Sequence, residues 1–294
     1  WEPPGKRTGT GGGGQQAEPG NGEGVDMAIV TIARLSGGGG EEIGKEVAKK
    51  LGYEYIGKNR ILKGVEVSGD KWLEWGKELD EHAPSPWERF DRSFTGFVSL
   101  VESAIYGYAL EERKVITGRG GNWLLKDVPF ALRLLITGSP EERAKRVSDR
   151  EHVNIATARR MIKFSDHERM EYLSIVYHRD PFDPREYDMV FDTDRMGQEE
   201  IVRLILDEIP ARAQRATPEA RETLRRMVVA AKVKAAICTN PRTYVPTLEV
   251  VHDGKEIVVR GIVHSPTEQK LVMEIANRVA TPTPVRSELH YRGA

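Results

Sequence analysis

The stretch AIVTIARLSGGGGEEIGKEVA (Ala28–Ala48) decides the fold of this chain. Residues 28–33 form a short apolar run typical of a buried β-strand, Gly37–Gly40 form a turn, and residues 41–51 have the apolar spacing of an amphipathic helix. Glycines let the backbone curl so that successive N–H groups point at an anion, and the helix N-terminus adds positive partial charge. The stretch therefore predicts a phosphate-binding turn, with a tight turn that serves only packing as the alternative.

The charges that usually accompany such a turn are missing. The common pattern is Gly-x-x-x-x-Gly-Lys followed by Ser or Thr. Alignment of the helix that follows places Gly40 at the lysine position and Glu41 at the position of the hydroxyl that holds Mg²⁺. Arg34, at the end of the strand, is the candidate for a replacement cation, whereas Glu41 is either a metal ligand or a partner of the helix dipole. The other residues predicted to contact phosphate are Ser36, Gly37, Gly38 and Gly39.

Composition restricts the class of protein. With 294 residues, of which 39% are hydrophobic and 30% charged, the chain is predicted to form two globular domains. A formal net charge of -1 creates no overall field for nucleic acid, so no such partner is expected. No apolar run reaches the roughly 20 residues of a membrane span. The single cysteine, Cys238, excludes an internal disulfide, and together these features predict a cytoplasmic location.

Strands and helices alternate over residues 27–209, which predicts an α/β domain with a parallel sheet. The last helix of this domain is expected to end before Pro210. Ser139-Pro140-Glu141-Glu142 predicts the start of another helix, because it combines a capping box with a proline in the first turn. The expected strands cover residues 28–33, 53–56, 114–117, 131–137 and 187–192.

The ends of the chain differ from this domain in composition. Residues 1–26 are rich in Gly, Gln and Glu and are predicted to be a disordered tail. A polar linker is predicted over residues 210–217. Residues 218–294 then predict a small α-β-β-α-β unit, in which Asp253-Gly254 is the turn of a hairpin. The strands expected in this unit cover residues 245–252, 256–263 and 285–291.

Three segments of the first predicted domain resemble the cytidylate-kinase-like family, relatives of the nucleoside monophosphate kinases. They are the helix segment Ile43–Tyr53, the strand end VITGRG (Val115–Gly120), and Leu134–Arg146, which leads into an arginine-rich helix. The resemblance implies a P-loop kinase-like fold with a three-layer parallel sheet over residues 27–209. It also implies transfer of the γ-phosphoryl group of ATP, with Mg²⁺, to a nucleoside monophosphate or a related small acceptor.

The resemblance implies a substrate contact at Arg119, which matches the family arginine that binds the acceptor nucleotide. A guanidinium binds phosphate with two parallel hydrogen bonds. The family's next residue, an aspartate, is Gly120 here. A group of aromatic residues is predicted to be core, with base stacking as the alternative: Trp72, Trp75, Trp87, Phe90, Phe94 and Phe97.

The resemblance further implies a lid that supplies catalytic residues. Arg143, Arg146 and Arg150 share one helix face by their spacing and would stabilise the moving phosphoryl group. Asp166 and Arg169 resemble the Asp-x-x-Arg of the family's lid, in which the aspartate orients the arginine or the metal. The alternative for the first three is a solvated face paired with neighbouring carboxylates.

The second predicted domain resembles the BON family, a small α/β module associated with membrane surfaces and with ligand or partner binding. The strand pair around Asp253-Gly254, the dipeptide Arg260-Gly261 and the helix over residues 265–280 carry this resemblance. It implies a protein partner or a membrane surface. The basic residues that would meet lipid headgroups are Arg260, Lys270 and Arg278.

Two functions follow from these patterns. The leading hypothesis is an ATP-dependent phosphotransferase with a degenerate phosphate loop, since phosphoryl transfer needs positioning and charge neutralisation more than covalent chemistry. The alternative is a nucleotide-binding sensor that turns over weakly or not at all and signals through its BON-like domain. The missing loop lysine motivates this alternative.

Overall fold

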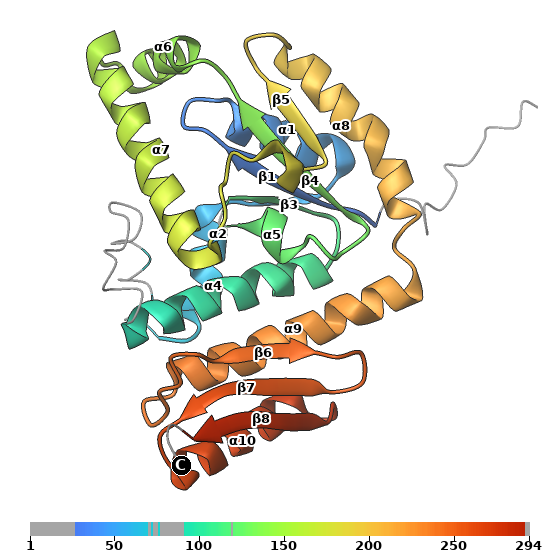
Figure 1. Ribbon diagram of the computed structural model, residues 1–294. Helices are drawn as coiled ribbons and strands as arrows, with labels where there is room; N and C mark the ends of the chain where they lie inside the picture. Colours follow the sequence, from blue (N-terminus) through green and yellow to red (C-terminus); the bar gives the residue numbers. More distant parts are fainter. Residues whose placement is uncertain (1–26, 70–71, 73–75, 77–90, 119, 292–294) are drawn as a thin grey trace, which may run out of the picture.

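The computed structural model describes residues 27–69, 72, 76, 91–118 and 120–291. Its larger unit is built on a five-stranded parallel sheet with the order β2-β3-β1-β4-β5 (Figure 1). The strands are β1 (Ile29–Arg34), β2 (Glu54–Ile56), β3 (Lys114–Thr117), β4 (Ala131–Thr137) and β5 (Met189–Asp192). This arrangement confirms the predicted α/β class.

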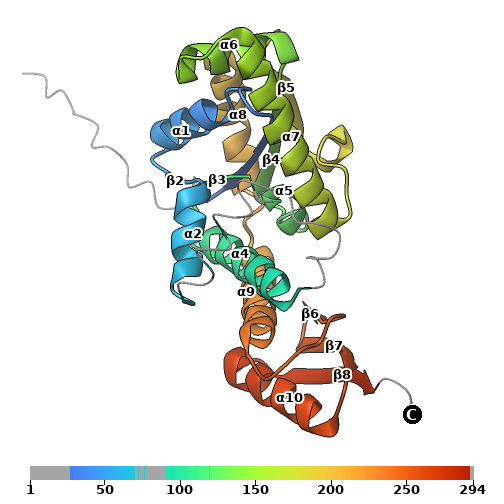
Figure 2. The ribbon, with the colours of Figure 1, turned by 90° about the vertical axis from the view of Figure 1, so that its left-hand side faces the viewer.

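Helices cover both faces of the sheet because successive β1 side chains point to opposite sides. Val30 and Ile32 belong to a core with α1 (Gly40–Leu51) and α8 (Gln198–Ala213). Ile29 belongs to the core on the other face. Figure 2 shows α1 and α8 on one side of the strands and α5 and α7 on the other. The helices of that second side are α2 (Lys58–Glu66), α4 (Arg92–Leu110), α5 (Gly121–Leu124) and α7 (Ile155–Tyr177).

The helix expected from the capping box is α6 (Pro140–Glu151), in which the Ser139 hydroxyl accepts a hydrogen bond from the Glu142 N–H. It packs against α7 beyond the carboxyl ends of the strands. In open parallel sheets, ligands bind outside the carboxyl ends of the strands, at the topological switch point where the strand order reverses. Here the order reverses at β1, which lies between β3 and β4.

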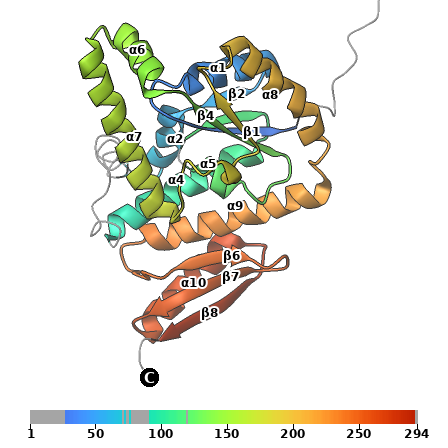
Figure 3. The ribbon, with the colours of Figure 1, turned by 45° about the horizontal axis from the view of Figure 1, so that its top comes forward.

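The smaller unit has the predicted α-β-β-α-β order. It contains α9 (Pro218–Thr239), β6 (Glu249–His252), β7 (Ile257–Val263), α10 (Pro266–Ala280) and β8 (Val285–Tyr291). Its sheet pairs β6 and β7 antiparallel and β7 and β8 parallel. Figure 3 shows α9 between this sheet and α4. The strand expected over residues 245–252 begins later, because Val245 and Leu248 close a turn instead.

The prediction that the last helix of the larger unit ends before Pro210 is wrong. Helix α8 continues to Ala213 with Pro210 inside it, although an interior proline costs about 3 kcal/mol. The extension places Arg212 against the sheet, where its guanidinium donates to the Ala131 carbonyl and pairs with Asp188 and Glu208. Part of the predicted linker over 210–217 is therefore helical.

Three of the aromatic residues considered above are described, and all three belong to the core. Trp72, Phe94 and Phe97 are buried together in the core that α2, α4 and α9 share. Trp75, Trp87, Phe90 and the tail over residues 1–26 lie outside the described residues. Within the described part of the chain, no helix is long and apolar enough to cross a bilayer.

A carboxylate at the start of β5 joins three elements of the larger unit. Asp188 accepts hydrogen bonds from the backbone and guanidinium of Arg133 in β4, and its Oδ1 lies 3.4 Å from Arg212 in α8. Burial alone raises the pKa of Asp188, but these cationic donors outweigh it and hold the pKa below its usual value. The charged form therefore stabilises the fold.

We expect Asp188→Asn to lower the free energy of unfolding by about 1.5–3 kcal/mol at neutral pH, because it leaves charged donors without a carboxylate. Since the folded pKa is depressed, the loss is complete above the unfolded pKa of about 3.9 and disappears as the pH falls through the folded value. Thermal unfolding of both proteins from pH 7 to pH 3 measures this. Glu151→Gln, at an exposed pair with Arg150, is the control and should change little.

Candidate functional site

The loop between β1 and α1 has the backbone that its glycines predict. Gly37 and Gly39 have φ values of 71° and 80°, in the left-handed region, and Gly39 caps α1. Gly37 also has no room for a side chain, since a Cβ there would lie 2.6 Å from the Arg143 carbonyl oxygen. The N–H groups of the first helical turn have no intrahelical acceptor and remain directed out of the helix. The loop can therefore bind an anion through its backbone.

One carboxylate holds the start of this loop in place. Asp166 of α7 accepts a hydrogen bond of 2.8 Å from the Ser36 N–H and forms an ion pair with Arg143 of α6. Arg143 in turn donates to the carbonyl oxygens of Ser36 and Gly138, each at 3.0 Å. These two side chains and the backbone segments that they bind form one network. It joins the loop, the end of β4 and both helices beyond the sheet.

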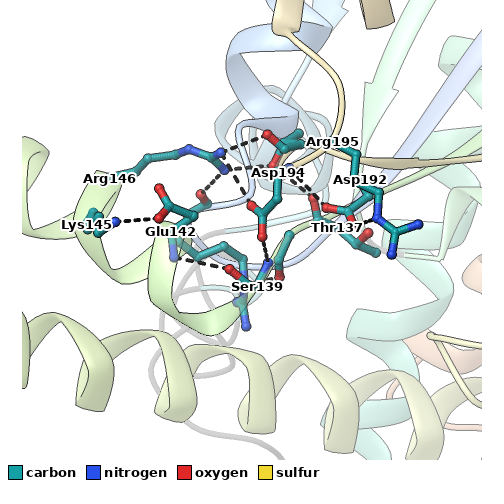
Figure 4. Close-up of polar contacts among 12 residues, drawn as sticks. Thr137, Ser139, Glu142, Lys145, Arg146, Asp192, Asp194 and Arg195 are labelled. Atoms are coloured by element: carbon teal, nitrogen blue, oxygen red, sulfur yellow. Dashed lines mark hydrogen bonds and ion pairs between the residues drawn. The ribbon is translucent and has the colours of Figure 1, made fainter.

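A second arginine of α6 holds the other side of the loop. Arg146 donates to the Gly37 carbonyl and to the hydroxyl and carbonyl of Thr193, which follows β5. Its guanidinium lies 3.8 Å from Asp194, whose carboxylate also accepts from the Ser139 N–H (Figure 4). Arg146 is partly exposed, with 38% of its side chain accessible, and it lines the cleft described next.

The loop forms one wall of a cleft of about 760 Å³, here called the glycine-loop cleft. Its other walls come from α6, α7 and the segment between β5 and α8. Four arginines and three carboxylates line it, which leaves an excess of positive charge. The charged residues are Arg34, Arg146, Arg150 and Arg169, with Glu41, Glu42 and Asp149.

Glu41 is ionised and already has cationic partners. Its carboxylate lies 2.7 Å from Lys45, one turn further along α1. The hydrogen bond from Lys45 is the main reason that the pKa of Glu41 is lowered, and Arg34 and Arg150 act in the same direction. These three cations offset the negative charge that replaces the usual hydroxyl at this position.

A second cleft of about 590 Å³, here called the side cleft, adjoins the first. The two share Arg34, Glu41 and Arg169. The side cleft lies between α1, the start of α2 and one face of α7, and cations again outnumber carboxylates. Its further charged and aromatic lining residues are Lys45, Tyr55, Lys58, Arg60, Phe164, Glu168 and Tyr172.

The structure separates the predicted catalytic residues into two groups. Arg146 and Arg169 line the glycine-loop cleft, and Arg169 also lines the side cleft and donates to the Arg34 carbonyl at 3.1 Å. Arg143 and Asp166 line neither cleft. Arg143 is 6% exposed and bound to protein atoms, so the expectation that it lies over the moving group is corrected: it positions the loop.

The remaining predictions also have distinct outcomes. Arg34, residues 36–40 and Glu41 all line the glycine-loop cleft. The N–H groups of Ser36 and Gly38 are already bonded, to Asp166 and to the Leu35 carbonyl, and contacts of these two residues with an anion stay a prediction. Arg119 lies outside the described residues.

Sequence reasoning missed the side cleft. Its residues come from α1, β2, α2 and α7, which are far apart in the chain. Two signals were present: the basic run Lys58-Asn59-Arg60 after the second strand, and the four-residue spacing of Phe164, Glu168 and Tyr172, which places them on one helix face.

The smaller unit presents a charged sheet face. Arg260 of β7 lies between Glu249 of β6 and Glu288 of β8 and pairs with both. Arg286 pairs with Glu288 and with further carboxylates at Asp253 and Glu256. Carboxylates outnumber arginines in this network. Arg260 is therefore engaged with protein carboxylates, which disfavours the lipid contact suggested for it.

Comparisons with known proteins match the larger unit to one family. The profile of the cytidylate kinase-like family matches residues 29–195. The cytidylate kinase of Sulfurisphaera tokodaii is 25% identical over 60% of this chain and 92% of its own, and that of Methanopyrus kandleri is 24% identical over 65% and 97%. A crystal structure of an uncharacterized protein from Eubacterium ventriosum has 23% identity and a TM-score of 0.48, over 62% of this chain and 98% of its own.

The family match ends at residue 195, so it does not extend over the smaller unit, and the resemblance of that unit to BON modules stays a prediction. Over the larger unit, the match covers β1 to β5. It includes the glycine loop, the helices α6 and α7, and the three residues that the two clefts share. The chain belongs to the cytidylate kinase-like family.

Proposed function

We propose that this protein transfers the γ-phosphoryl group of ATP to a nucleoside monophosphate. The observation that carries the proposal is the junction of the two clefts at Arg34, Glu41 and Arg169. ATP phosphates would occupy the glycine-loop cleft, and the acceptor would enter the side cleft. Both substrates bring several negative charges, and each cleft has an excess of cations to receive them.

The reaction follows from this arrangement. A phosphate oxygen of the acceptor attacks the γ-phosphorus of ATP, and the bond from that phosphorus to the β–γ bridging oxygen breaks. ADP leaves, and the acceptor becomes a nucleoside diphosphate. Charge on the moving group is spread over its oxygens, so guanidinium groups at the junction lower the barrier. Arg169, which lines both clefts, would take this role, and Arg146 and Arg150 would extend it along the ATP side.

Mg²⁺ would enter this site bound to the phosphates of ATP. Within the described residues, no group of three or more His, Cys, Asp or Glu side chains is arranged to hold a metal ion without a ligand. Mg²⁺ usually binds through one or two carboxylates together with substrate phosphates. Glu42 and Asp149 line the ATP cleft and are candidates for that contact, since Glu41 is bound to Lys45. The ion would neutralise phosphate charge.

Acceptor-dependent ADP formation tests the proposal directly. Purified protein with ATP and Mg²⁺ is given each nucleoside monophosphate in turn, and a coupled assay measures ADP. We expect ADP only when an acceptor is present, with the nucleoside diphosphate formed in equal amount. ADP at the same rate without acceptor would contradict the proposal.

The absence of the loop lysine and hydroxyl keeps a non-catalytic sensor as the second candidate. In that case no acceptor supports turnover, yet ATP raises the midpoint of thermal unfolding. A concentration-dependent rise follows from binding to the folded state alone. An unchanged midpoint in millimolar ATP would count against both candidates.

Asp166→Asn is expected to weaken ATP binding about tenfold through loss of loop positioning, because hydrogen bonds to a charged group contribute about 1.5–3 kcal/mol and about 1.4 kcal/mol corresponds to a tenfold change in affinity. The amide keeps the size of the side chain but removes the charge that pairs with Arg143. Titration calorimetry with Mg·ATP measures the affinity. Glu222→Gln, at an exposed pair with Arg225 in α9, is the control, and equal affinities of the two variants would refute the role.

A further inference from the structure

The glycine loop exchanges two residue types relative to the usual pattern. In Gly-x-x-x-x-Gly-Lys, a glycine stands six positions before the lysine. In this chain, Arg34 stands six positions before Gly40. The cationic side chain has thus moved from the first residue of the helix to the last residue of the strand, and the position without a side chain has moved the other way.

The structure gives a steric reason for this exchange. A Cβ atom at Gly40 would lie 2.7 Å from the Cβ of Arg34 and 3.2 Å from its Cγ. Ile136 blocks the remaining direction at 3.3 Å. A Cβ is fixed by its backbone and cannot rotate away, unlike the end of a long side chain. Only one of positions 34 and 40 can therefore carry a side chain, and here it is position 34.

The arginine extends from there toward the junction of the two clefts. Its Nη1 occupies the space in which a Cβ of Gly118 would lie, at the end of β3. Gly118 has a φ of 82°, in the left-handed region, so the backbone conformation at this position also favours glycine. Arg34 lines both clefts. The pKa of Glu41 is lowered mainly by Lys45, and Arg34 adds to this effect. Burial raises the pKa of Tyr55, and Arg34 opposes that rise. Its guanidinium thus lies between the sites proposed for ATP and acceptor.

We infer that Arg34 is the catalytic cation that replaces the loop lysine, and that it contacts both the moving phosphoryl group and the acceptor phosphate. The inference rests on the proposed function. A lysine at position 40 would approach the phosphates from the ATP side alone. An arginine at the strand end reaches both substrates, and its planar guanidinium can bind two phosphate oxygens at once.

Arg34→Gln tests the charge. We expect kcat to fall about 100-fold, the usual loss when one donor to the developing charge is removed. The KM for the acceptor should rise as well, because the same guanidinium binds the acceptor phosphate. A fall in kcat with an unchanged acceptor KM would overturn the contact with the acceptor, and unchanged values of both would overturn the inference as a whole.

Gly40→Ala tests the steric exclusion without removing any charge. The added methyl group should displace Arg34 and reduce kcat at least tenfold. Gly107→Ala in α4 is the matched control, since a Cβ there meets no atom within 4 Å and should leave kcat unchanged. Thermal midpoints of all variants separate these effects from misfolding. If Gly40→Ala keeps the wild-type kcat, positions 34 and 40 do not exclude one another and the inference is wrong.

The double variant Arg34→Gly with Gly40→Lys restores the glycine and the lysine of the common pattern and leaves Glu41 in place. The glycine at position 34 is required, because alanine would keep the Cβ that collides. We expect the double variant to exceed Arg34→Gly at least tenfold in kcat, whereas Gly40→Lys alone should be less active than the wild type. Equal kcat values for the double variant and Arg34→Gly would contradict the exchange of roles.

A binding measurement keeps the inference testable if the proposed function fails. If the wild type shows no turnover with any acceptor, titration calorimetry with CMP is used as the readout. Arg34→Gln should then weaken CMP binding at least tenfold, and Gly107→Ala should not. Equal affinity of the wild type and Arg34→Gln, or no binding of CMP to the wild type, would overturn the role of Arg34 independently of the kinase assay.

Discussion

The Asp166 carboxylate is the contact on which the site depends. It receives the Ser36 N–H from the glycine loop and the Arg143 guanidinium from α6, and it lies 3.6 Å from Arg169. Arg143 then donates to the Ser36 carbonyl in the loop, and Arg169 donates to the Arg34 carbonyl at the end of β1. Without this charge, two arginines next to each other would repel, and the loop would lose its connection to α6 and α7. Removing one partner of a buried pair is costly because the other remains charged.

Helix α9 makes the division between the two units less sharp than the sequence suggests. Leu224 and Val228 belong to the core of the larger unit, whereas Val233 and Ile237 belong to the core under the smaller sheet. A half-buried ion pair of 2.8 Å joins Lys234 of α9 to Glu102 of α4. Burial alone lowers the pKa of Lys234, but Glu102 reverses this and raises it. The smaller unit is thus attached through a shared helix and not through the polar segment before it.

The parts of the fold that depend on local sequence could be predicted. The strand, glycine turn and helix around residues 28–51 follow from apolar spacing and from the φ values that glycine permits. The role of Arg143 could not be predicted in this way. Its spacing from Arg146 indicates a shared face but not what that face contacts. Whether it meets solvent, substrate or the protein depends on the packing of α6 against α7 and the loop.

The side cleft was missed for a related reason, since no segment of the sequence contains it. Tyr55 lies in β2, Lys58 begins α2 and Glu168 lies on α7, and only the parallel order of the strands brings these elements together. Spacing within one helix or strand can group residues of that element alone. The extension of α8 past Pro210 has the same origin, because contacts of Arg212 with distant residues outweigh a local preference.

The charges around the loop support the proposal of a phosphate site without the usual lysine. A lysine is a compact cation on a flexible stem, whereas arginine has a planar group that keeps its shape and its charge. In this chain the cations of the glycine-loop cleft are arginines, and Arg146 and Arg169 are held by hydrogen bonds to backbone carbonyls. Lys45 balances Glu41 from the neighbouring cleft. Positive charge is therefore distributed over several fixed groups around the loop, which suits a reaction whose negative charge is spread over several oxygens.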